Sequence, residues 1–232
     1  MTTTVQSIVD KAQIILQDTS AIRWPESELV SWVNDAQRAI VLIKPDASAT
    51  NETVTLVTGS KQSIPSGGNR LLSVIRNMSA ASGGNGGRTI RIVDKEVLDA
   101  QAPSWHDPAA TGLSKHGTTV KHYVYEESDP RTFYVYPGVA GNAYCEIVYS
   151  ANPAAVTISD NIGLPDLYSV AIMNYVIYMA YMKDADFAGH QQRAASHFQL
   201  FMTSVSGKSQ LDILTSPNSE RPDPTLNPMM GN

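Results

Sequence analysis

The sequence predicts an α+β fold, with a helical bundle built from both chain ends, an inserted antiparallel β-domain and an extended C-terminal tail. Apolar residues recur at three- and four-residue steps before residue 50 and again after residue 165, as in amphipathic helices. Between these parts, residues 53–150 alternate between polar and apolar, often β-branched or aromatic, residues, as strands do. Residues 207–232 hold four prolines among polar residues, a composition too polar for a core. The expected units are therefore 1–50, 51–157, 158–206 and 207–232.

Composition excludes several classes of protein. The chain has 232 residues, of which 42% are hydrophobic and 17% charged, with a net charge of −5. Dedicated nucleic-acid binders are normally basic, so this class is disfavoured. The single cysteine, Cys145, excludes an internal disulfide framework and a zinc site built on several thiolates. Residues 1–17 lack the basic start and apolar run of a signal peptide, so we expect a protein kept in a reducing cytoplasm.

Two helices are predicted before residue 50. The first follows the apolar stripe from Val5 to Leu16. The second begins after Trp24-Pro25, because proline suits the first turn and Glu26 and Glu28 favour the positive end of the helix dipole. Pro45 ends it. Neither stripe can bury itself, so both helices must pack on another part of the chain.

The middle of the chain predicts strands, with the clearest at 122–125, 132–136 and 143–149. A short helix is expected over 94–100, followed by a long loop over 103–119 that contains Trp105. A glycine-rich segment is predicted to form a flexible hairpin tip or a long loop. We expect it to contact a partner protein, and its residues are Gly83, Gly84, Asn85, Gly86 and Gly87.

The segment from Leu167 to Met182 is apolar on every side of a helix. Its 16 residues fall short of the roughly 20 that span a bilayer, so we predict a buried helix and no membrane contact. A small monomer covers only part of such a helix, and the alternative is a plain core helix in a larger monomer. Aromatic side chains with polar tips suit a protein–protein contact, which we predict at Tyr168, Tyr175, Tyr178 and Tyr181.

A further helix is expected over 185–205, and the tail follows it. Apolar residues in this otherwise polar tail are spaced like anchors for a partner protein. They are Leu211, Ile213, Leu214, Leu226, Met229 and Met230.

No motif assembles a catalytic, metal or cofactor site. Gly59-Ser60-Lys61 lacks the earlier glycine of a phosphate-binding loop, since position 54 is Val54. The five histidines show no metal-ligand spacing with one another or with carboxylates. We therefore predict no enzyme, no metal and no cofactor, although an unrecognised enzyme stays an alternative.

Three segments together resemble bacteriophage head-to-tail adaptor, or connector, proteins. They are Trp24-Pro25-Glu26-Ser27-Glu28 continuing to Ala47, Leu164-Pro165-Asp166-Leu167-Tyr168 with Asn174-Tyr175 and Tyr178, and Lys183-Asp184-Ala185-Asp186-Phe187 with Ala194-Ala195 and Phe198-Gln199-Leu200-Phe201. The resemblance covers the two helical ends, about 5–47 and 162–206.

The resemblance implies a structural virion protein at the head–tail interface, assembled in the bacterial host cytoplasm. It implies a homo-oligomeric ring, usually of twelve copies, beneath the portal protein. The tail of each chain would run along the portal, and the β-domain would face the tail tube, nozzle or tail-completion protein. Genomic DNA would pass through the ring without sequence-specific binding, and an acidic ring would not retain it. The alternative is a host-surface or carbohydrate-binding module whose face is formed by the aromatic strands and the Trp105 loop.

Overall fold

A computed structural model describes residues 3–187 and 189–214 of the chain, with backbone only for 208–214. These residues form five α-helices and eight strands, so the predicted α+β class is confirmed. The chain divides into two compact units. A helical unit joins the residues before Pro45 to those after Ala154, and a β unit comprises Pro45–Ala154.

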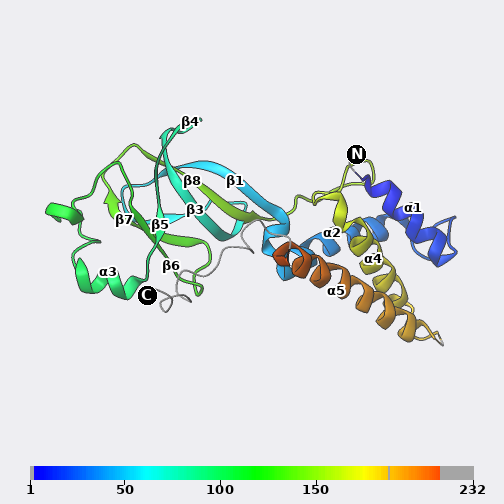
Figure 1. Ribbon diagram of the computed structural model, residues 1–232. Helices are drawn as coiled ribbons and strands as arrows, with labels where there is room; N and C mark the ends of the chain where they lie inside the picture. Colours follow the sequence, from blue (N-terminus) through cyan, green and yellow to red (C-terminus); the bar gives the residue numbers. More distant parts are fainter. Residues whose placement is uncertain (1–2, 188, 215–232) are drawn as a thin grey trace, which may run out of the picture. The chain divides into compact units, whose positions relative to one another are not determined.

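The helical unit consists of α1 (Val5–Leu16), α2 (Glu26–Ile43), the short 3-10 turn η3 (Asp166–Tyr168), α4 (Ser169–Lys183) and α5 (His190–Leu214). The α4 helix contacts α1, α2 and α5 (Figure 1). Most of its circumference is buried, through Ala171, Ile172, Asn174, Val176, Ile177, Ala180 and Tyr181. Within the described part of the chain, no helix is both long and apolar enough to cross a membrane.

The turn between α1 and α2 is organised by one carboxylate. Asp18 accepts backbone N–H bonds from Ile22, Arg23 and Trp24, and these bonds lower the pKa of its carboxyl group. The turn then reaches the end of α4, because the Trp24 indole donates to the Ala180 carbonyl at 3.1 Å. Arg23 pairs with Asp184 at 2.6 Å. These contacts tie the two helices before the β unit to the helix after it.

The β unit contains two four-stranded sheets. The first has the order β1-β8-β3-β4, formed by β1 (Ala49–Leu56), β8 (Ala143–Ala151), β3 (Gly68–Ala80) and β4 (Gly83–Thr89). The second has the order β2-β7-β6-β5, formed by β2 (Gly59–Ser63), β7 (Thr132–Val139), β6 (His122–Tyr125) and β5 (Arg91–Ile92). One apolar core joins them, with Leu71, Val74, Phe133, Val135 and Ile147 among its members. The short turns η1 (Pro45–Ser48) and η2 (Gly112–Ser114) complete the unit.

The outer face of the second sheet is also covered. Leu98 of α3 (Lys95–Gln101) and Trp105 of the following loop pack on Val124 of β6. This second, smaller core explains why aromatic residues alternate along β6 and β7. Along both strands, successive side chains face alternately the core between the sheets and the smaller core beneath α3 and its loop.

Three buried or half-buried amide side chains each hold one loop residue by two hydrogen bonds. Asn34 pairs with the backbone N–H and C=O of Val156 at 2.8 and 3.0 Å. Gln62 does the same for Val57, and Asn77 for Val120, with all four distances 2.8 Å. A carboxamide offers one donor and one acceptor, so it replaces the neighbouring strand that these loops lack. We call these three contacts the amide clamps.

Three elements differ from the sequence predictions. The glycine-rich segment is not a hairpin tip, because the turn is Ala81-Ser82 and the glycines form strand β4. The β-domain is not wholly antiparallel, since β5 and β6 run parallel across a connection long enough for a crossover. The extended tail does not begin at residue 207, because α5 continues to Leu214 through good helix formers such as Lys208 and Gln210.

The β4 segment is rich in glycine because side chains of β3 lie across it. A Cβ atom at Gly86 would approach Arg76 Nη1 to 2.7 Å, and one at Gly84 would approach Ser79 Oγ to 2.4 Å. Packing therefore favours glycine at positions 84 and 86, and the positive φ of Gly83 and Gly84 favours it there, whereas position 87 has room for a side chain.

Replacing Asn77 by alanine tests the amide clamps. The change leaves the N–H and C=O of Val120 and the carbonyl of Arg88 without their partner. Unpaired buried backbone groups make the folded state less stable, so we expect a loss of about 2–4 kcal/mol in the free energy of unfolding. Urea denaturation measures it, and hydrogen exchange at the Val120 amide should accelerate in parallel. Asn51→Ala, at an exposed amide, is the control and should cost less than about 1 kcal/mol. Equal losses in the two variants would contradict the clamp.

Candidate interaction surfaces

The described residues offer no accessible catalytic constellation. Ser60 Oγ lies 2.7 Å from His106 Nδ1, but Ser60 is buried, and burial lowers the pKa of His106. Cys145 is fully buried, and desolvation raises the pKa of its thiol to about 12, so it is not a nucleophile. In this part of the chain, no cluster of three or more His, Cys, Asp or Glu residues could hold a metal ion.

The Trp105 loop does not form the exposed aromatic face expected for a carbohydrate-binding module. Trp105 is 1% exposed, and its indole donates to Asp99 at 2.8 Å. Its ring meets Tyr134 and Tyr136 edge-on. A sugar-binding platform needs an accessible ring face, so this loop belongs to the core of the β unit and nothing in it favours that alternative.

Four aromatic rings from α4 and α5 form a continuous cluster, which we call the aromatic cluster. Tyr175 lies 5.8 Å from Tyr178 and 5.1 Å from Phe201 between ring centroids. Tyr178 lies 5.0 Å from Phe198, which lies 6.1 Å from Phe201. Phe201 is buried, whereas Phe198 is 41% exposed and both tyrosines are half-buried. The cluster is therefore packed on one side and open on the other.

The open side continues along α4. Tyr175, Tyr178, Met179 and Met182 are half-buried or exposed, and their spacing of three, four and seven residues places them on one helix face. Aromatic residues and methionine are enriched in protein–protein interfaces relative to other surfaces. This stripe is the side of α4 that the chain's own helices leave least covered.

The structure corrects the predicted interface tyrosines in part. Tyr168 is 2% exposed and Tyr181 is 6% exposed, so both belong to the monomer core and do not present an outer face. Tyr175 and Tyr178 lie on the open face, and their contact with another chain stays a prediction. The sequence analysis did not single out Met179 and Met182, although their helical spacing from Tyr175 and Tyr178 could have placed them on the same face.

Other apolar side chains of the helical unit are exposed away from the aromatic cluster. Leu42 is 84% exposed, and Ile14, Ile22, Leu167, Val170 and Phe187 are also exposed. Leu42 was missed because it lies outside the apolar stripe of α2: it follows Ile40 by two residues and lies on the opposite side of the helix.

The glycine strand β4 borders a polar hollow of the β unit. The hollow has a volume of about 410 Å3. It is lined by Asn77, Met78, Ser79, Asn85, Gly86, Gly87, Arg88, Thr118, Thr119, Asn142 and Tyr144. The predicted tail-side residues Gly83–Gly87 thus lie on an exposed edge strand rather than on a loop, and their contact with a partner stays a prediction.

The predicted tail anchors fall in two groups. Leu211, Ile213 and Leu214 belong to the last two turns of α5 and not to an extended segment. Leu226, Met229 and Met230 lie outside the described residues.

Comparison with known proteins identifies a family for this chain. The model of a family described as SU10 adaptor protein matches residues 3–221, which include nearly all of both units. No curated protein matches the chain. The family match agrees with the resemblance to phage head-to-tail adaptors carried by the two helical ends. The chain therefore belongs to the SU10 adaptor protein family, whose members are structural adaptors of phage particles.

Proposed function

We propose that the protein is a head-to-tail adaptor of the virion, assembled in the host cytoplasm as a ring that is dodecameric by analogy with the adaptors it resembles. The ring would join the portal protein to the tail and line the channel for genomic DNA. The observation that carries this proposal is the open aromatic cluster and its continuation along α4 in a chain of this family. We place this surface in the contact between neighbouring copies.

Charge supports the proposed passage of DNA. The chain has a net charge of −5, so twelve copies would carry about 60 negative charges around the channel. A channel wall that shared this sign would not attract phosphates, so DNA would meet no strong electrostatic resistance to its passage. The β unit, with the glycine strand, would face the tail tube, nozzle or tail-completion protein.

Replacing Phe198 by aspartate tests the ring contact. If neighbouring copies cover the aromatic cluster, an unpaired carboxylate there costs about 2–4 kcal/mol per contact. We expect the ring population to fall at least about thirtyfold in mass photometry, with or without added portal. Circular dichroism should stay close to that of the unmodified protein, because Phe198 is already partly exposed.

Two further variants make the ring test specific. Thr203→Asp adds the same charge on the opposite side of α5 from Phe201 and should leave the ring intact. Tyr178→Ser removes a ring without adding charge and should weaken assembly less than Phe198→Asp. Rings of Phe198→Asp at the unmodified yield would place the contact elsewhere on the helical unit.

Removing residues 215–232 tests portal docking. The truncation keeps α5 whole, so we expect the shortened chain to fold and to form rings. Ordering an extended segment costs about 1–2 kcal/mol of backbone entropy per residue, so one tail binds weakly and many tails on a ring bind together. The shortened ring should therefore fail to co-sediment with portal rings. Retention at the level of the full chain would show that the helical unit alone makes the joint.

Replacing Gly87 by aspartate tests the tail-side contact. A Cβ at Gly87 meets its nearest atom at 3.4 Å, so the substitution fits the strand, and it places a charged side chain on the exposed β4 edge. We expect portal docking to persist and tail attachment to fall, as counted by electron microscopy of assembled particles. Gly67→Asp, at a site with nothing within 4 Å, is the matched control and should attach tails normally. Normal tail attachment by Gly87→Asp would remove β4 from this contact.

A further inference from the structure

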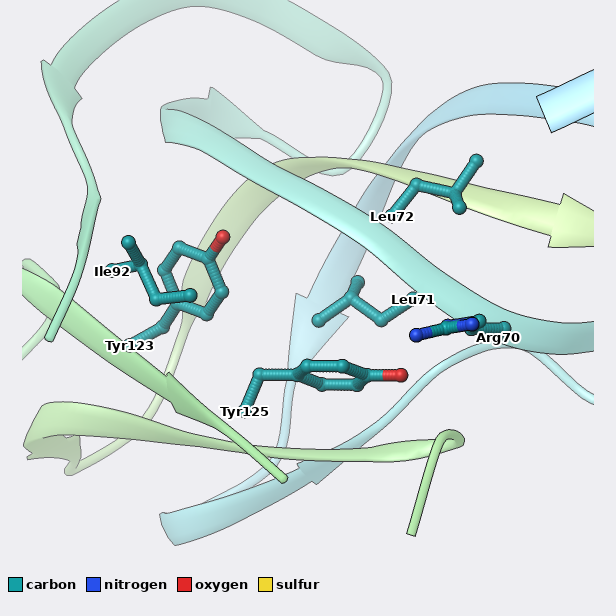
Figure 2. Close-up of a pocket in the computed structure, with 6 residues that line it drawn as sticks. All are labelled: Arg70, Leu71, Leu72, Ile92, Tyr123 and Tyr125. Carbon is teal, nitrogen blue, oxygen red and sulfur yellow. The ribbon is translucent and has the colours of Figure 1, made fainter. Parts of the chain in front are cut away.

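A half-open cavity of about 190 Å3 lies between the two sheets of the β unit. Its lining residues come from β3 on one side and from β5 and β6 on the other (Figure 2). The walls are apolar, formed by Leu71, Leu72 and Ile92 and by the rings of Tyr123 and Tyr125. At one end, the hydroxyl of Tyr125 points towards the guanidinium of Arg70 (Figure 2).

Two groups at this end can donate hydrogen bonds: the buried Tyr125 hydroxyl and the Arg70 guanidinium, whose side chain is 44% exposed. The Tyr125 hydroxyl is buried and has no hydrogen-bond partner among the described residues. The Arg70 guanidinium meets Glu127 at 3.8 Å, which is beyond hydrogen-bond distance. The other hydroxyl in the cavity wall differs, because Tyr123 interacts with Ser73 and with the backbone of Val74. At this end of the cavity, the Tyr125 hydroxyl therefore lacks an acceptor, and the Arg70 guanidinium adds a positive charge beside it.

The size and polarity of the cavity define what fits it. Its volume is below the roughly 300–1,000 Å3 of small-molecule sites, so it suits a single side chain. Apolar walls favour an aliphatic stem, and a cation with a neighbouring hydroxyl favours an anionic acceptor at the tip of that stem. A nucleic-acid phosphate lacks such a stem and is attached to bulky sugars, so it suits the apolar walls poorly.

We infer that this cavity binds the carboxylate side chain of a glutamate from a partner protein, with Arg70 and Tyr125 as its two donors. The β5 strand borders the cavity at an edge of its sheet but spans only Arg91–Ile92, so the partner presents its glutamate past this edge rather than as a paired strand. Exposed Ile92 of β5 adds an apolar contact at the mouth. Assigning the glutamate to the tail-side protein rests on the proposed function, whereas the carboxylate site rests on the cavity alone.

Hexanoate is a suitable probe, because it carries a carboxylate on an aliphatic stem. In the full chain with labelled methyl groups, we expect hexanoate to shift the NMR signals of Leu71, Leu72 and Ile92. Hexan-1-ol, which has no carboxylate, should bind about tenfold more weakly, and inorganic phosphate should leave these signals in place. Equal binding of hexanol, shifts caused by phosphate, or no shift with hexanoate would each overturn the inference.

Variants identify the donors. Arg70→Gln and Tyr125→Phe should each weaken hexanoate binding about five- to tenfold, whereas Lys61→Gln, at an exposed cation of β2, should not change it. Glu127→Gln should strengthen binding, because the carboxylate that competes for Arg70 is removed. Unchanged affinity in both Arg70→Gln and Tyr125→Phe would overturn the site. Ring formation, measured on the same samples, should be unaffected in every variant, so failure of the carboxylate site is distinguishable from failure of the ring.

Discussion

The apolar surface of α4 must be removed from water on nearly every side, and this requirement determines which parts of the chain belong together. The helices that enclose α4 come from both sides of the β unit in sequence, α1 and α2 before it and α5 after it. The Trp24 indole and the Ala180 carbonyl join these parts by a buried hydrogen bond. Where the enclosure is least complete, aromatic rings and methionines remain on the surface. The open aromatic cluster is thus a direct result of how many helices the chain supplies.

The β unit is subject to a different constraint: several of its backbone N–H and C=O groups have no neighbouring strand with which to form hydrogen bonds. The carboxamides of Gln62 and Asn77 provide a donor and an acceptor at the places where Val57 and Val120 would otherwise lack both. Asn34 does the same for Val156 in the helical unit. A buried polar group that lacks a hydrogen bond destabilises the folded state. By pairing such backbone groups, these amides allow segments without regular secondary structure to pack against the cores.

Much of the fold could be predicted from the sequence where one physical signal dominates. Apolar periodicity identified α1, α2 and α4 within about two residues, and aromatic alternation identified β6, β7 and β8. The glycine segment could not be placed, because its composition reflects the side chains of Arg76 and Ser79 that lie across it in space. Likewise, Tyr168 and Tyr181 resemble Tyr175 and Tyr178 in sequence. Only the packing of neighbouring helices decides which of the four are covered. The cavity at Arg70 and Tyr125 joins two strands far apart in the chain and leaves no local signal.

The division of the helical unit between both ends of the chain has a consequence for the time at which it can form. Synthesis proceeds from the N-terminus, so residues 45–154 emerge complete and can pair their strands while α4 and α5 are still missing. The aromatic cluster takes two rings from α4 and two from α5, so it does not exist until the ribosome has made nearly the entire chain. If neighbouring copies meet at this cluster, as proposed, a nascent chain has no finished surface with which to join them. The order of synthesis would then exclude unfinished subunits from assembly.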